Sequence, residues 1–114
     1  MHLTRLASVA AILLIAGLSA FTAVKSVTAA APAASTVRID NFTFSPAEIT
    51  IASGTAVTWE NRDDIPHVVV AADKAFRSKV LDTDESYTFT FTSPGIYEYF
   101  CALHPHMKGK VIVK

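Results

Sequence analysis

The sequence contains a single cysteine among 114 residues, so a disulfide bond within the chain is excluded. The sequence also lacks an excess of charge of either sign. Ten Lys and Arg residues balance ten Asp and Glu residues, and the formal net charge is zero. A general nucleic-acid binder would carry a basic excess. Charged residues make up only 18% and hydrophobic residues 51%, which is not the composition of a disordered chain. Length and composition together predict one small globular domain.

A charge-free stretch lies near the N-terminus. Residues Leu6–Val24 carry no charged side chain and follow a short start that contains Arg5. A basic start, an apolar Ala10–Leu18 segment and small residues beyond it are typical of a secretory signal peptide. We predict that residues 1–29 are this signal, with cleavage after Ala29 in preference to Ala20, and that residues 30–36 are a flexible linker. A retained membrane anchor is the alternative, because 19 uncharged residues could just span a bilayer.

Export changes what the charge and the cysteine imply. Residues 1–29 hold Arg5 and Lys25 and no acid, which leaves 8 basic against 10 acidic residues after cleavage, a net charge of −2. With or without cleavage the domain is exported, and we expect a periplasmic protein. A free thiol in an oxidising compartment is a liability unless something occupies it. The lone cysteine of this small domain therefore needs an explanation.

From Val37 onward the hydrophobic pattern has the period of two that is typical of β-strands. Tyr87–Thr92 alternates aromatic residues with threonine over six residues, as a half-buried strand does. Turn residues separate such runs, and Asp73–Leu81 is the least regular segment, either a loop or one helical turn. The pattern predicts an all-β domain over residues 37–114, an antiparallel β-sandwich of about seven to eight strands. The other predicted strands are Val37–Phe44, Glu48–Ala52, Ala56–Asn61, His67–Ala72, Gly95–Cys101 and Lys110–Lys114.

An immunoglobulin domain is a sandwich with similar local features. Tyr99 and Cys101, with Trp59 upstream, match the Tyr-x-Cys motif and the core tryptophan of that fold. The immunoglobulin pattern needs a second cysteine on the opposite sheet, and the sequence has none. Cys101 therefore has another role.

The residues after this cysteine carry metal-binding chemistry. The alternation along the strand places Cys101 on the same face as Tyr97 and Tyr99, so its side chain should point into the core. Cys101, His104 and Met107 are spaced three apart in a tight loop, and all three side chains can turn toward one point. They supply a thiolate, an imidazole and a thioether.

A second imidazole is available at His67, which precedes a run of three valines. Two His, one Cys and one Met match the His₂Cys set with a weak axial Met of electron-transfer copper sites. Magnesium and calcium prefer oxygen ligands, which this set does not offer. A structural zinc site usually adds a fourth Cys or His in place of a thioether. The set therefore favours one copper ion.

Each of these residues also has a simpler interpretation. Cys101 could be an inert buried residue, His67 a polar residue at a strand edge, and Met107 a packing residue between loop and core. His106 lies between two candidate ligands on the opposite side of the loop, so we expect it to be exposed and not a ligand. Trp59, Phe89 and Phe91 are expected in the core.

The whole motif resembles that of a known family. Cys101–Val111 reads Cys-x-x-His-x-x-Met-x-Gly-x-Val, which resembles the cupredoxins, the type 1 blue copper proteins, and most closely their amicyanin branch. The resemblance covers about Val37–Lys114 and implies a Greek-key β-sandwich that shuttles electrons. It also implies one copper ion with four ligands, His67, Cys101, His104 and Met107. Further stretches that resemble amicyanin-like sequences are Phe44–Pro46, Gly54, Val57–Asn61, Pro66–His67 and Pro94–Tyr99.

Three positions depart from the family pattern. Val68 follows His67 where many cupredoxins have an Asn that braces the ligand loops. The backbone N–H of Val68 could still donate to the Cys101 sulfur. His106 stands where amicyanin has a Phe, and Phe100 stands where a more polar residue is usual. These departures affect the expected partner and potential and leave the proposed ligand set intact.

The resemblance predicts an exported one-electron carrier that cycles between Cu(II) and Cu(I) and is not an enzyme. We expect the electron to pass through His104, whose imidazole edge should reach the surface. Pro66, Leu103, Pro105 and Met107 would form an apolar collar suited to a small, transient interface. Redox partner proteins are expected to dock near His104, Pro105 and Pro66. We expect a monomer with no nucleic-acid partner, which contacts a membrane only if the N-terminal segment is retained.

Three other functions compete with this one. A copper carrier or storage protein would use the same four ligands without redox turnover. An enzyme would use Cys101 as nucleophile with His104 or His67 as base. An adhesive β-sandwich without metal would leave the spacing of Cys, His and Met as a coincidence.

Overall fold

A computed structural model describes Gly17 and residues 34–114 of the chain. The predicted signal segment, residues 1–29, lies outside the described residues apart from Gly17, as do residues 30–33 of the predicted linker. Within the described residues, no helix has the length and apolar character needed to span a membrane.

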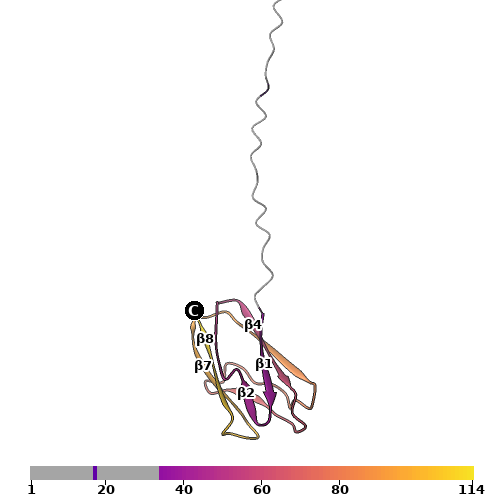
Figure 1. Cartoon of the computed structure of the whole chain (residues 1–114). Helices are drawn as coiled ribbons and strands as arrows, with labels where there is room; N and C mark the ends of the chain where they lie inside the picture. The colour runs from indigo at the N-terminus through magenta and orange to yellow at the C-terminus, as the bar shows by residue number, and fades with distance from the viewer. Residues whose placement is uncertain (1–16, 18–33) are drawn as a thin grey trace, which may run out of the picture.

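Two four-stranded sheets face each other and enclose the core (Figure 1). One sheet has the strand order β2-β1-β4-β6 and the other the order β3-β8-β7-β5. The chain passes repeatedly from one sheet to the other, and the predicted all-β sandwich is confirmed. The strands are β1 (Ala34–Asp40), β2 (Thr43–Ser45), β3 (Glu48–Ile51), β4 (Thr55–Asn61), β5 (Val69–Ala71), β6 (Ser86–Phe91), β7 (Gly95–Cys101) and β8 (Lys108–Val113).

Each sheet contains one parallel pair of strands, whereas the sequence pattern suggested antiparallel pairing. Strand β1 runs parallel to β4, and β3 runs parallel to β8. The other neighbouring strands are antiparallel. Between β1 and β4 the chain visits the opposite sheet as β3, and this crossover lets β4 return in the direction of β1.

One predicted strand is divided in the structure, and the bounds of the others differ from the predicted ones by at most two residues. The run Val37–Phe44 is divided between β1 and β2 by a tight turn at Asn41 and Phe42, whose φ angles are 49° and 56°. Two-residue hairpin loops favour positive φ at both positions, and Asn adopts this conformation readily. Asp73–Leu81 is an irregular loop held by single bridges from Arg77 to Val70 and from Leu81 to His67, so it is not the helical turn that was the other option.

The core is built around Trp59, which is fully buried. Its ring packs against Phe76, Tyr99 and Phe91, with centroid separations of 5.4, 5.3 and 6.4 Å. Trp59 and Phe91 are therefore core residues as predicted, and Phe89 is partly buried against them.

Gly109 on β8 lies opposite Tyr99 on β7. A Cβ atom at position 109 would collide with the Tyr99 ring. Only glycine lets the aromatic ring lie directly over the neighbouring strand. The glycine of the Met-x-Gly-x-Val motif is therefore a packing requirement of the sandwich.

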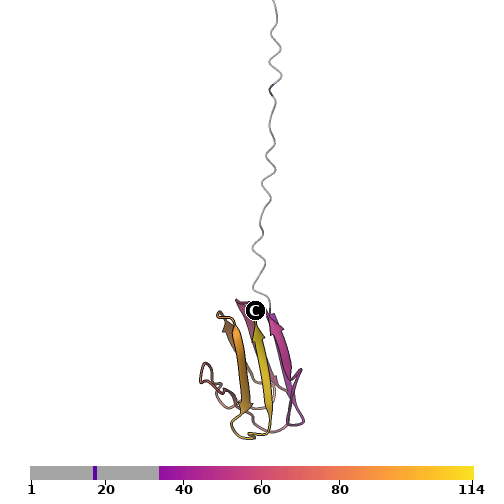
Figure 2. The ribbon, with the colours of Figure 1, turned by 90° about the vertical axis from the view of Figure 1, so that its left-hand side faces the viewer.

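One end of the sandwich gathers the segments that carry the candidate ligands. The loop from β7 to β8 and the β1–β2 turn both lie at this end (Figures 1 and 2). The C-terminus lies at the opposite end, because β8 runs the length of the sandwich away from the loop (Figure 2).

Candidate metal centre

Cys101 is the last residue of β7 and is completely buried. Tyr99 is buried on the same face, while Ile96 on the other face is 67% exposed, so the predicted alternation of this strand is confirmed. The Cys101 sulfur accepts a hydrogen bond from the backbone N–H of Val68, with an N–S distance of 3.4 Å. The backbone of Val68 therefore makes the hydrogen bond to the sulfur that was expected of it, although its side chain is not an Asn.

His67 is also completely buried. It lies just before β5 and is held by two backbone hydrogen bonds with Leu81, of 3.0 Å from its N–H and 2.8 Å to its carbonyl. Its Nδ1 is 3.6 Å from the Cys101 sulfur. Two segments 34 residues apart in the sequence are thereby brought together.

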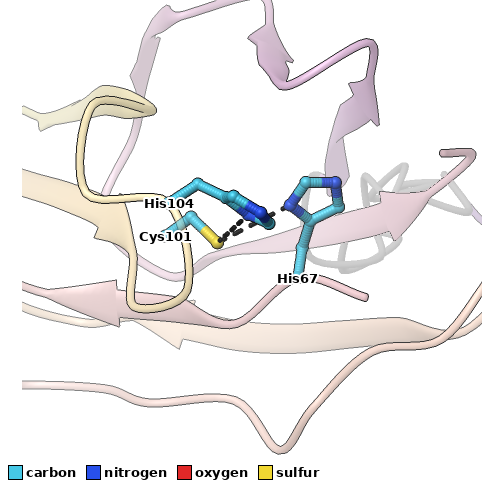
Figure 3. Close-up of side chains that lie close together, drawn as sticks. All are labelled: His67, Cys101 and His104. Carbon is cyan, nitrogen blue, oxygen red and sulfur yellow. Dashed lines mark hydrogen bonds between the residues drawn. The ribbon is translucent and has the colours of Figure 1, made fainter. Parts of the chain in front are cut away.

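His104 points to the same sulfur, on the side where the His67 ring also lies (Figure 3). Its Nδ1 is 3.7 Å from Cys101 Sγ. The loop is tightly closed, because the His104 N–H donates to the Cys101 carbonyl and the Met107 N–H donates to the His104 carbonyl, at 3.2 and 2.9 Å. One ligand atom from each of His67, Cys101 and His104 lies within 4.8 Å of the others.

Met107 closes the loop and is 5% exposed. Its carbonyl accepts a hydrogen bond of 3.1 Å from the Cys101 N–H, so the start and the end of the loop are joined. Pro105 and His106 between them are exposed, as predicted for His106. His104 itself is partly exposed, and Leu103 is 48% exposed.

The spacing of these donor atoms fits a shared metal ion. Metal–nitrogen and metal–sulfur bonds of about 2.0 and 2.3 Å, as found for zinc, separate two ligand atoms by about 3.6 Å when they meet at a trigonal or tetrahedral angle. The observed separations from Sγ are 3.6 and 3.7 Å. No carboxylate belongs to this cluster among the described residues, so its soft and borderline donors suit copper better than a cation that prefers oxygen.

Asp63 contacts a candidate ligand, and the sequence reasoning missed it. Its Oδ2 is 2.9 Å from His67 Nε2, and the side chain is only 8% exposed. Burial alone would raise the pKa of Asp63, but hydrogen bonds from His67 and from the backbone N–H groups of Phe42 and Asp64 outweigh it, and the pKa is lowered. The ionised carboxylate favours the proton of His67 on Nε2. The Nδ1 lone pair that faces the sulfur is then free to bind a metal.

Asn61 holds the loop that carries Asp63 and was also missed. It is completely buried, and its Nδ2 donates to the carbonyls of Ile65 and Leu81 at 2.9 and 2.8 Å. Its Oδ1 accepts a 2.9 Å hydrogen bond from the Asp63 N–H. This last contact is an Asx turn, and Asn two residues before Asp was the only local signal that could have pointed to it.

Ser78 fixes the backbone two residues after His67. Its hydroxyl oxygen accepts a 2.9 Å hydrogen bond from the Val69 N–H and donates to the Lys79 carbonyl at 2.7 Å. Ser78 is buried, and its own N–H donates to the Val69 carbonyl at 2.8 Å. The backbone next to His67 is therefore held by the irregular loop 73–81.

Comparison with known proteins agrees with this geometry. The family model described as a cupredoxin-like domain matches residues 8–113. The chain belongs to the cupredoxin family. This cupredoxin is similar to amicyanin-alpha of Methylorubrum extorquens, with 38% identity over 112 residues that cover 87% of this chain and 94% of the relative. It is also similar to the amicyanin of Paracoccus versutus, with 40% identity over 83 residues, 68% of this chain and 63% of the relative.

Solved structures give the same result. A purple cupredoxin from Nitrosopumilus maritimus matches with a TM-score of 0.68 and 31% identity, over 70% of this chain and 99% of that chain. The Cu(I) form of an amicyanin mutant matches with a TM-score of 0.66 and 34% identity, over 71% of this chain and 82% of that chain. The predicted cupredoxin fold is confirmed, and the family together with the donor set identifies the cofactor as one copper ion in a type 1 site.

One enzyme also has a related part. A copper-containing nitrite reductase from Thermus scotoductus matches with a TM-score of 0.66 and 34% identity over 74% of this chain, but over only 22% of the enzyme chain. The likeness therefore extends to one domain-sized part of that enzyme.

Proposed function

We propose that this cupredoxin is an exported one-electron carrier whose copper ion is bound by His67, Cys101, His104 and Met107. The observation that carries the proposal is the convergence of two imidazole nitrogens on the buried Cys101 sulfur, at 3.6 and 3.7 Å. When bound, copper supplies a reversible one-electron couple between Cu(II) and Cu(I). The protein's part is to hold the ligands, tune the couple and guide the partner.

The ligands are held so that little rearrangement is needed between oxidation states. His67 is fixed by Asp63 on one side and by Leu81 backbone hydrogen bonds on the other. Cys101 is buried and receives a single N–H donor from Val68, which stabilises negative charge on the sulfur and tunes the potential. Met107 would supply a thioether ligand, which would favour Cu(I) and raise the potential.

His104 is the proposed exit for the electron. His67 has no exposed surface, whereas His104 is partly exposed. Three exposed apolar residues adjoin the two histidines in the sequence: Pro66 next to His67, and Leu103 and Pro105 on either side of His104. They would supply an apolar rim around His104. A small apolar surface of this kind suits transient docking of a redox partner protein to a monomer.

The composition of the ligand set also favours a carrier over an enzyme. Catalytic metal sites keep a coordination position open for water or substrate. The two His, one Cys and one Met of a type 1 site would leave no such position open. Residues 34–114 contain one cluster of His, Cys, Asp or Glu side chains that could hold a metal ion, formed by His67, Cys101 and His104. This part of the chain has no comparable group of ligands for an additional metal centre that could be catalytic.

The visible and EPR spectra of the full chain loaded with Cu(II) test the proposal. We expect an intense blue band and a narrow copper hyperfine splitting, both of which require a thiolate ligand. The Cys101→Ser variant should lose both features, and His106→Phe, the matched exposed-residue control, should keep them. A pale, ordinary Cu(II) spectrum of the native chain would refute the type 1 site. A blue protein that gives up copper readily to chelators and does not cycle would instead be a copper carrier or store.

A further inference from the structure

Phe42 lies against both candidate histidine ligands although it is 51% exposed. Its ring meets the His104 ring at a centroid distance of 5.0 Å and an interplanar angle of 87°. It meets the His67 ring at 6.0 Å and 86°. Both arrangements are edge-to-face, the geometry that aromatic pairs prefer. A large apolar side chain at the surface thus contacts the two imidazoles that face the sulfur.

The position of this ring is determined by the β1–β2 turn. Asn41 and Phe42 both have positive φ, and the flanking residues Asp40 and Thr43 pair across the hairpin. The Phe42 N–H donates a 3.1 Å hydrogen bond to Asp63 Oδ2. The same oxygen lies 2.9 Å from His67 Nε2. One carboxylate oxygen therefore connects the turn that carries Phe42 with the first ligand.

His104 lacks the polar anchoring that His67 has. Among residues 34–114, the polar contact of its ring is the one to Cys101 Sγ, with no carboxylate partner of the kind that Asp63 provides for His67. The aromatic neighbours of the ring are Phe42 at 5.0 Å and His67 at 5.1 Å. His67 is itself a proposed ligand, so Phe42 is the aromatic neighbour of His104 that does not belong to the proposed ligand set.

We propose that Phe42 is a positioning residue that holds the His104 imidazole in its ligating orientation, in the metal-free protein and when copper is bound. The proposal rests on the copper site proposed above. It deepens that function, since the residue that restrains the outer ligand also lies on the surface where a partner would approach. Without the ring, His104 gains orientations that face solvent, and copper leaves the site faster.

The test compares Phe42→Ala, Phe42→Leu and Phe42→Tyr with the native chain, with Ile96→Ala as control. Ile96 is also exposed and hydrophobic but lies near the start of β7, far from Cys101 at its end. An edge-to-face pair is worth about 0.5–1.5 kcal/mol. Phe42→Ala should therefore speed the transfer of Cu(I) from the reduced, copper-loaded protein to an excess of a Cu(I) chelator about two- to tenfold. Phe42→Tyr should restore the native rate, and Phe42→Leu should fall between.

A second readout needs no copper. In proton NMR spectra of the metal-free native chain, cross-peaks should join the ring protons of Phe42 and His104, and Phe42→Ala should show averaged His104 ring signals. Circular dichroism checks that each variant is folded. Native release rates and unchanged His104 signals in folded Phe42→Ala would overturn the inference. Absence of a blue band in the native chain would instead refute the type 1 site, while the metal-free spectra would still decide the role of Phe42.

Discussion

Removing the Asp63 carboxylate should destabilise the metal-free protein, because this side chain organises the ligand end of the sandwich. It accepts hydrogen bonds from the Phe42 and Asp64 N–H groups at 3.1 and 3.0 Å, and His67 Nε2 lies 2.9 Å from it. Asp63→Ala leaves the ring N–H of buried His67 and the backbone N–H of Phe42 without their acceptor. Asp63→Asn keeps the shape and one carbonyl oxygen but loses the charge.

The size of the effect follows from these contacts. A hydrogen bond to a charged group contributes about 1.5–3 kcal/mol, and a buried donor left without an acceptor costs about 1–3 kcal/mol. We therefore expect Asp63→Ala to lower the free energy of unfolding by about 2–4 kcal/mol and Asp63→Asn by roughly half of that. In a domain of this size each kcal/mol shifts Tm by about 4–8 °C. A fall of roughly 10–30 °C is expected for Asp63→Ala.

The same change should alter the dependence of stability on pH. The pKa of Asp63 is lowered in the folded protein, so its stabilising contribution is complete above the unfolded pKa of about 3.9. That contribution is lost as pH falls through the folded pKa. The difference in stability between the native chain and Asp63→Ala should therefore shrink as pH falls below the unfolded pKa.

Urea unfolding of the metal-free protein measures this directly. Trp59 is the only tryptophan of the sequence and is fully buried, so its fluorescence reports the loss of the core. Asp64→Ala is the matched control, because Asp64 is the adjacent carboxylate and is exposed. Equal urea midpoints for the native chain and Asp63→Ala, with equal m-values, would refute the role assigned to Asp63. So would an Asp64→Ala variant that loses as much stability.

Three further changes test other parts of the structure. Met107→Gln should keep the copper and lower the reduction potential measured by voltammetry, because the thioether would favour Cu(I); an unchanged potential would count against an axial Met107. Gly109→Ala should cost about 2–4 kcal/mol in urea unfolding, because the new Cβ collides with the Tyr99 ring, whereas Gly54→Ala, with positive φ and open space around it, should cost only about 1 kcal/mol. His106→Phe should leave the blue spectrum unchanged and alter only the rate of electron exchange with a redox partner in stopped-flow experiments; a changed spectrum would place His106 at the copper.

Much of the site could be predicted because it lies in one short segment. Cys101, His104 and Met107 fall within seven consecutive residues, and the alternation of Tyr97, Tyr99 and Cys101 shows which way the thiol points. His67 was found because the chemistry of a copper site requires a second imidazole. Periodicity alone was sufficient for the all-β fold, since a period of two identifies strands without information on their neighbours.

The residues that were missed act through contacts between distant segments. Asp63 meets the N–H of Phe42, which is 21 residues away, and Asn61 holds the carbonyl of Leu81, which is 20 residues away. Phe42 was included in a longer strand, although a turn places its ring over the ligands. No local pattern distinguishes a buried bracing carboxylate from an exposed loop carboxylate such as Asp64.

The residue patterns of the chain were enough to determine that the domain is built of strands, which way the cysteine points and which metal its donors favour. Alternation depends on neighbouring residues, and ligand chemistry depends on residue types. Tertiary structure decided the parallel pairing of β1 with β4 and of β3 with β8, and the group of Asp63, Asn61 and Phe42 around the histidines. The strand pairing depends on which segments cross between the sheets, and the grouping of side chains depends on which segments finish at the same end of the sandwich. Such placement is selected by the packing of the whole core and by the pairing of buried polar groups, and it has no signature within any one segment.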